Sequence, residues 1–175
     1  INAVSKMLYT PRLIFATYVL PSPPLFAQRF REYMSQLIPE VEEVSYPPED
    51  FKINGKVYKY SPDPLFNELP WSYTSLVEFF DAYVNTDPKI LLMDNPEAMG
   101  LHPELMKKFF DILFREMGRG EGPKLMFIAT QSSDIYVELA QRSDENVAFV
   151  LLNDGKYAVI TRDEVLDRIA HEDLR

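Results

Sequence analysis

The sequence predicts an α/β fold in which helices cover a mainly parallel sheet and an antiparallel hairpin element is appended. Two patterns lead to this prediction. In the second half of the chain, short apolar runs alternate with segments of helical periodicity, an order that is typical of parallel sheets. In the first half, apolar and polar residues alternate around Asn54-Gly55, a dipeptide that favours a tight hairpin turn.

The first half is expected to hold two strand-forming and two helical segments. Residues 14–20 are β-branched and aromatic, which indicates a buried strand. Residues 25–38 repeat apolar side chains every three or four positions, as an amphipathic helix does, and Pro39 then ends the helix. A small antiparallel sheet is expected over residues 41–60 and a helix over residues 72–85.

The second half is expected to contain strands at 89–93 and 124–129, helices at 103–117, 134–141 and 163–171, and a hairpin over 147–161. The hairpin turn is placed at Asn153-Asp154-Gly155. We divide the chain into an amino-terminal strand, helix and hairpin part, residues 1–68, and a lobe of residues 69–175. The two parts are predicted to form one compact domain together.

The composition fits a single domain with a packed core, because 46% of the 175 residues are hydrophobic and 26% are charged. The longest apolar runs, such as residues 13–20, are far shorter than the roughly 20 residues that a membrane-spanning helix needs. The chain opens with Ile1 and lacks a signal-peptide pattern, so removal of an upstream segment stays open. Fourteen prolines suit a heat-stable protein and equally an ordinary loop-rich domain.

Charge and cysteine content exclude several classes of function. The net charge is −9 and the acidic residues are spread along the chain, so direct binding of nucleic acid is not expected. The absence of cysteine excludes disulfides, thiolate nucleophiles and cysteine zinc sites, and two distant histidines do not form a metal cluster. A cytoplasmic location is the expectation.

The residues with the clearest chemistry stand at the end of the apolar strand KILLMD, where Asp94 is the last residue. Open α/β folds bind their ligands at the carboxyl edge of the sheet, where this carboxylate would lie. Magnesium takes only one or two protein carboxylates when it also binds phosphate, so Asp94 alone is chemically sufficient. A second interpretation is that Asp94 caps the following turn, since Asp-Asn-Pro is favourable turn chemistry.

Residues 87–114, DPKILLMDNPEAMGLHPELMKKFFDILF, resemble the Walker B segment and D-loop of ABC-type ATPases, particularly the chromosome-maintenance, double-strand-break-repair and OLD-nuclease branches. Residues 125–134, LMFIATQSSD, resemble the next strand and the switch of that family. Residues 69–80, LPWSYTSLVEFF, lie where the family has its signature serine and helix. The resemblance extends from Leu69 to Gly155 and implies the carboxyl-terminal part of an ABC/RecA-like P-loop fold.

The resemblance also implies a magnesium–ATP site, with Asp94 as the residue that holds the metal. The other implied nucleotide contacts are Asn95, Gln131, Ser72 and His102. Ser72 precedes Asp94 by 22 positions and Gln131 follows it by 37, spacings that are usual in the family. For His102, a helix cap is a second interpretation, because Pro103 follows it at the start of a predicted helix.

Four departures from the family pattern argue against hydrolysis by this chain. Asn95 replaces the catalytic glutamate, and loss of a general base costs roughly 10² to 10⁴ in rate. Gln131 replaces the switch histidine and Tyr73 replaces a signature glycine, while Met99 is an extra residue in the D-loop. Glu97 could serve as the base only if the turn aims it at the γ-phosphate.

No G-x-x-x-x-G-K-[S/T] phosphate loop is present in the sequence. The first hypothesis is therefore a degenerate ATPase-like domain that acts as an interaction or regulatory module and binds Mg²⁺ and ATP weakly. A protein partner or a second copy would meet its D-loop and signature faces. The alternative is the carboxyl-terminal half of an active ATPase whose phosphate loop lies upstream or on a partner chain. A third reading is a plain binding domain.

Overall fold

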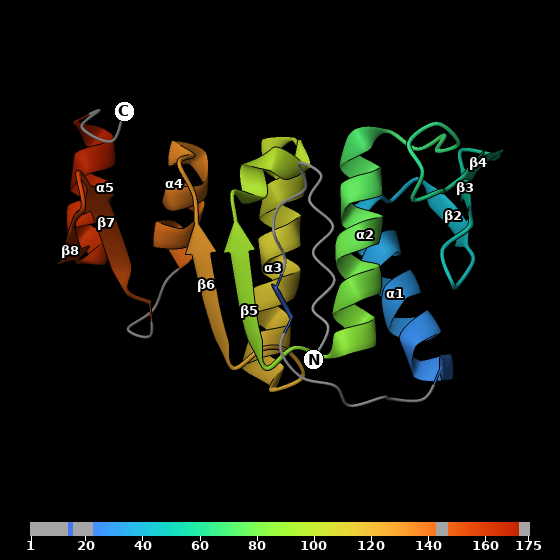
Figure 1. Ribbon diagram of the computed structural model, residues 1–175, viewed down its shortest axis with the longest axis horizontal. Coiled ribbons are helices and arrows are strands. Elements are labelled where there is room, and N and C mark those ends of the chain that lie inside the picture. Colours follow the sequence, from blue (N-terminus) through green and yellow to red (C-terminus); the bar gives the residue numbers. More distant parts are fainter. Residues whose placement is uncertain (1–13, 16–22, 143–146, 172–175) are drawn as a thin grey trace. The chain divides into compact units, whose positions relative to one another are not determined.

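The computed structural model describes residues 14–15, 23–142 and 147–171 (Figure 1). These residues belong to two compact units, Ile1–Ala129 and Thr130–Arg175. Within the described residues, no helix is both long and apolar enough to span a membrane.

Three helices form the body of the first unit, as the periodicity predicts. They are α1 (Pro23–Leu37), α2 (Trp71–Thr86) and α3 (Pro103–Arg119). Helix α1 begins two residues before the predicted start, because proline needs no intrahelical N–H partner in a first turn. Helix α3 also opens with a proline and ends at Gly120, whose φ of 72° suits the left-handed residue after a helix.

The strand pairing of the first unit shows that the prediction of a mainly parallel sheet of the ABC/RecA-like type is wrong. Strands β5 (Ile90–Asp94) and β6 (Leu125–Ala129) pair in parallel through the α3 crossover, and β1 (Ile14–Phe15) joins β5 antiparallel. Among the described residues, this β5–β6 pair is the only parallel one. Residues 16–20 of the predicted first strand lie outside the described residues.

Of the connections between paired strands that the structure describes, only the one through α3 is a parallel crossover, and the strands of the first half are joined by short connections. A parallel pair needs a crossover of a dozen or more residues, whereas two-residue turns permit antiparallel pairing only. Strands β3 (Asp50–Ile53) and β4 (Lys56–Lys59) are joined by Asn54 and Gly55, and β2 (Val41–Val44) pairs with β3. Both turn residues have positive φ, 48° and 76°, so the predicted Asn-Gly hairpin is confirmed.

The core of the first unit is a cluster of aromatic rings between the three helices. Phe79, Phe80 and Phe109 are fully buried, and the Phe79 and Phe109 ring centroids lie 4.8 Å apart in an edge-to-face arrangement. Tyr33 of α1 brings its ring centroid to 4.7 Å from that of Phe80. The helical spacing of these aromatics, which predicts core positions, is therefore confirmed.

A buried carboxylate joins the helices beside this cluster. Glu116 of α3 accepts a hydrogen bond from the Tyr33 hydroxyl at 2.9 Å, and the guanidinium of Arg29 lies 3.3 Å from the same oxygen. Arg29 also forms an ion pair with Asp87, in the turn between α2 and β5, at 3.7 Å. Because a buried charge must be paired, these contacts hold α1, α3 and the start of β5 in one arrangement.

The second unit is small and consists of two helices and a hairpin. These are α4 (Ser133–Arg142), β7 (Phe149–Asn153), β8 (Lys156–Ile160) and α5 (Arg162–Ala170). The hairpin turn contains Asp154 and Gly155 with φ of 46° and 74°, as predicted from Asn-Asp-Gly. The Arg162 Nε donates to the Ala140 carbonyl at 2.7 Å and so ties α5 to α4.

We predict that Gly122→Ala destabilises the first unit. A Cβ at this position would lie 2.8 Å from the Glu116 Cβ and 2.9 Å from the Tyr83 hydroxyl, so the buried network must shift. Overpacking of this kind costs about 1–3 kcal/mol. The matched control is Gly118→Ala, because a Cβ on this helical glycine meets nothing within 4 Å. Urea denaturation should show a lower free energy of unfolding for Gly122→Ala than for the parent, and no such decrease for Gly118→Ala. Equal decreases in the two variants would contradict the packing argument.

A second prediction concerns Glu78 on α2, whose pKa is raised because burial penalises its charged form. The folded state therefore binds this proton more tightly than the unfolded state, and stability falls as the pH rises through the range between the ordinary and the raised pKa. Glu78→Gln removes the penalty. The variant should be more stable than the parent at neutral pH, by an amount that shrinks as the pH falls.

Chemical denaturation across a pH series measures this gap. Glu49→Gln, in an exposed loop, makes the same charge change without burial and serves as the control. A stability gap for Glu78→Gln that stays constant with pH, or that the control reproduces, would mean that burial of Glu78 is not its cause.

Candidate functional site

The candidate site begins where β5 and β6 end side by side. Asp94 is the register partner of Ala129, and the backbone N–H of Asn95 donates to the Ala129 carbonyl at 2.8 Å. Asp94 therefore lies at the carboxyl edge of a parallel strand pair, as the strand pattern predicts. The chain then turns through Asn95, whose φ is 52°, into the short helix η1 (Pro96–Met99).

The carboxylate of Asp94 is exposed, and it has no hydrogen-bond or ion-pair partner among the described residues. The reading in which Asp94 caps the turn is therefore not what the structure shows. The residue before η1 is Asn95, and no side chain caps that short helix. Asn95 contributes its backbone instead, because asparagine tolerates the left-handed conformation that the turn needs.

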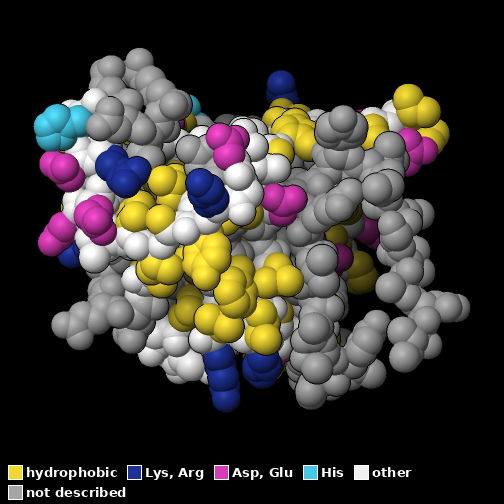
Figure 2. Space-filling model, turned by 60° about the vertical axis from the view of Figure 1, so that its left-hand side comes forward, with side chains coloured by type: hydrophobic (Ala, Val, Ile, Leu, Met, Phe, Trp, Pro, Cys, Tyr) yellow, Lys and Arg dark blue, Asp and Glu magenta, His cyan; other side chains and the backbone are white. Residues whose placement is uncertain are grey.

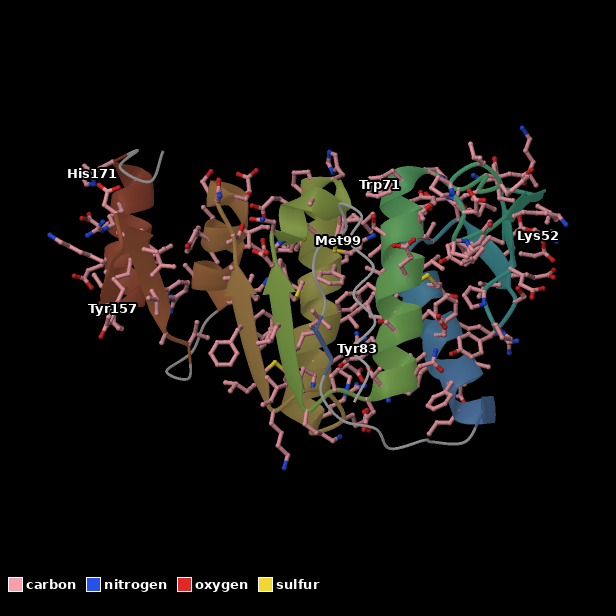
Figure 3. The ribbon with its side chains drawn as sticks, viewed as in Figure 1. Lys52, Trp71, Tyr83, Met99, Tyr157 and His171 are labelled. Atoms are coloured by element: carbon pink, nitrogen blue, oxygen red, sulfur yellow. The ribbon has the colours of Figure 1, made fainter. Side chains whose placement is uncertain are left out.

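Trp71, the single tryptophan of the chain, connects the start of α2 to η1. Its indole Nε1 donates to the Ala98 carbonyl at 3.3 Å. The ring also lies 3.0 Å from the point where a Cβ on Gly100 would stand, so a glycine permits the close approach. The residue stays 52% exposed, and Figure 3 labels Trp71 at the end of α2 that faces η1.

Met99 has a packing role in the turn after β5. Met99 is almost completely buried (1% exposed) and closes η1 before Gly100, whose φ of 66° turns the chain toward α3. The Gly100 N–H donates to the Glu97 carbonyl at 3.1 Å. An apolar anchor on one side and a hydrogen-bonded indole on the other therefore hold this turn in one conformation.

His102 acts as the residue that caps α3. Its Nδ1 accepts a hydrogen bond from the Glu104 N–H at 3.4 Å, and Pro103 is the first helical residue. This is the helix-cap interpretation of His102. The start of α3 follows η1 directly, and the start of α2 is held against η1 by Trp71, so both helix N-termini lie at the same end of the first unit as Asp94. Their partial positive charges favour an anion there.

The other predicted site residues differ in where they lie. Ser72 is partly exposed in the first turn of α2, next to Trp71. Tyr73 follows it and is partly buried, which raises the pKa of its phenol. Glu97 lies within η1 and is partly exposed. Gln131 belongs to the second unit, in the turn before α4, where the Ser132 N–H donates to the Thr130 Oγ1 at 3.0 Å.

At this site, the carboxylate of Asp94 is the group of the first unit that could bind a metal ion. No group of three or more His, Cys, Asp or Glu side chains converges on a metal position within the described part of the chain. Magnesium that is also bound to phosphate keeps several waters and needs only one or two carboxylates, so an accessible Asp94 fits that single role. The residues that the structure brings together at this end of the first unit are Asp94, Asn95, Glu97, Ser72 and His102.

Sequence reasoning missed the contact between Trp71 and Ala98. The sequence places this tryptophan beside a proline at the start of a predicted helix. That position suits both an exposed contact surface and a buried ring, so the sequence alone did not decide between them. The structure shows a tryptophan that is half exposed and whose indole donates a hydrogen bond to the turn.

Comparison with known proteins does not assign this chain to a family, since no family model matches it and no curated protein does.

Proposed function

We propose that the edge around Asp94 is a contact site for Mg²⁺ and ATP in an ATPase-like domain that does not hydrolyse ATP by itself. The observation that carries the proposal is an exposed, unpaired carboxylate at the end of a parallel strand pair. A carboxylate in this position is free to bind a metal ion, because no side chain of the described residues competes for it. Asp94 would hold the magnesium ion, which supplies positive charge to the phosphates.

Two further features of the first unit support an anionic ligand at this edge. The N-termini of α2 and α3 lie beside η1, and the partial positive charge at the start of a helix attracts phosphate oxygens. Ser72 adds a hydroxyl in the first turn of α2 that can donate a hydrogen bond. Trp71 and Met99 hold η1 in place, so the edge is largely preformed.

The same residues argue against hydrolysis by the isolated chain. Asn95 follows Asp94 where a general base is needed, and an amide does not accept a proton from water. The sequence contains no phosphate loop with its lysine, so the β and γ phosphates lack their usual cradle. We therefore propose a cytoplasmic interaction or regulatory module, in which a protein partner meets the turn beside the bound nucleotide.

The alternative is the carboxyl-terminal half of an active ATPase. This alternative rests on the absence of a phosphate loop from this sequence, because an upstream segment or a partner chain could supply the loop. Glu97, which is partly exposed within η1, would then be the candidate base. A release of phosphate that appears only when such a segment is added, and that Glu97→Gln abolishes, would favour this alternative.

We predict weak, magnesium-dependent binding of ATP by this chain, measured by titration calorimetry at millimolar nucleotide. Asp94→Ala should weaken it at least tenfold, the effect of losing roughly 1.4 kcal/mol of binding free energy. Glu49→Ala removes one negative charge in an exposed loop outside the edge and is the matched control. Phosphate release should stay at the background rate in all three proteins.

Either of two results would refute the proposal. One is the absence of heat from binding at millimolar ATP and magnesium. The other is binding that Asp94→Ala leaves intact, because the ligand would then occupy a different surface.

A further inference from the structure

The indole of Trp71 is held at one edge, while the residue as a whole is 52% exposed. Its Nε1 donates to the Ala98 carbonyl at 3.3 Å, and its Cδ1 is the side-chain atom nearest to the point where a Cβ on Gly100 would stand, at 3.0 Å. Both atoms belong to the five-membered ring. The contact with the turn after β5 is therefore made by one edge of the ring system, and the rest of the ring is not needed for it.

Exposure alone does not set Trp71 apart, because Figure 2 shows a face of the molecule on which other hydrophobic side chains gather. The difference lies in how the side chain is held. Leu65 and Phe66, in the loop before α2, are 87% and 70% exposed, and their hydrogen bonds to Asp63 are made by backbone N–H groups. In Trp71 the side chain itself is hydrogen-bonded. A flat ring of fixed orientation can bind a planar ligand with little further loss of side-chain entropy.

Trp71 also stands near the carboxylate that is proposed to hold magnesium. Ala98, which accepts the indole hydrogen bond, follows Asp94 by four positions. The Ala98 N–H donates to the Asn95 carbonyl at 2.9 Å, so the chain between them is coiled and not extended. At roughly 2 Å of rise per residue in such a turn, the two ends are on the order of 8 Å apart. All of these residues belong to the first unit, so their spacing is fixed within it.

This spacing suits the two ends of a nucleotide. In a nucleoside triphosphate, the base lies at the opposite end of the molecule from the phosphates that bind magnesium. A metal ion at Asp94 would therefore leave the base several ångströms away, on the distance scale that separates Trp71 from Asp94. Bases stack on aromatic side chains, and the loss of such a ring weakens binding by roughly tenfold. The fused rings of a purine cover more of an indole than the single ring of a pyrimidine does.

Trp71 already has a structural role, since its hydrogen bond holds η1. The two roles use different parts of the side chain. Holding the turn requires the indole N–H, whereas stacking requires an aromatic face. Phenylalanine at position 71 keeps an aromatic face and loses the N–H, and leucine loses both. Comparison of these two substitutions therefore separates stacking from support of the turn.

We propose that Trp71 stacks against the base of the bound nucleotide and makes the site selective for purine nucleotides over pyrimidine nucleotides. This inference rests on the proposed contact of Mg²⁺ and ATP with Asp94, and it names the class of nucleotide that the site prefers. The stacked ring makes no bond to phosphate, so its effect is confined to ligands that carry a base.

The test is titration calorimetry of the whole chain with ATP, CTP and inorganic tripolyphosphate, each in the presence of magnesium. The parent should bind ATP several-fold more tightly than CTP. Trp71→Leu should lower the ratio of the ATP affinity to the tripolyphosphate affinity by roughly tenfold, and Trp71→Phe should keep most of it. This ratio is the quantity to compare, because a displaced metal site would weaken both ligands alike and leave their ratio unchanged.

Fluorescence gives a second readout, because Trp71 is the only tryptophan of the chain. ATP should quench its emission with the dissociation constant found by calorimetry, and tripolyphosphate should not. Heat of binding without quenching would overturn the stacking inference and leave the nucleotide site in place. Absence of both heat and quenching would refute the site and the stacking together.

Two further results would also overturn the inference. One is an unchanged affinity ratio in Trp71→Leu, which would mean that Trp71 only supports the turn. The other is an equal fall of the ratio in Trp71→Phe and Trp71→Leu, because the aromatic face would then contribute nothing.

Discussion

One buried carboxylate links the helices of the first unit. Glu116 lies inside α3, and its charge is paired by Arg29 and by the hydroxyl of Tyr33, both from α1. The same arginine reaches Asp87, in the turn that leads from α2 into β5. Because a buried charge without partners costs several kcal/mol, the helices and this turn must keep the arrangement that pairs it.

This arrangement decides where the chemistry lies. Strand β5 starts beside the paired charges and runs past the aromatic core to Asp94 at the other end. The hydroxyl of Tyr83, which is buried near the same network, has no hydrogen-bond partner among the described residues, and burial raises the pKa of this phenol. The end of the unit where β5 starts therefore holds paired charges. At the carboxyl end of β5 lie two helix N-termini and the carboxylate of Asp94, which has no partner within the described part of the chain.

The turn after β5 shows how the departures from the ATPase pattern act structurally. Asn95 adopts the left-handed conformation and donates its N–H to β6, and Met99 anchors η1 in the core. Trp71 then fastens this turn to α2 through the Ala98 carbonyl. Asn95 and Met99, which depart from the pattern that the sequence resembles, therefore have a structural role in this turn.

Local signals by themselves determined most elements of this protein. The three helices of the first unit, the Asn54-Gly55 hairpin and the second hairpin at Asp154-Gly155 follow from periodicity and turn chemistry, which act over a few residues. The strand-end position of Asp94 was also predictable, since an apolar run that closes with an acid is a local pattern.

Only the tertiary structure decided how the strands pair and which side chains meet. Strand direction depends on connections and on partners far away in the sequence, so the mainly parallel sheet implied by the ATPase resemblance was wrong. The pairing of Glu116 with Tyr33 spans 83 positions, and that of Trp71 with Ala98 spans 27. Contacts at such separations arise from packing of whole elements, and no local pattern in the sequence encodes them.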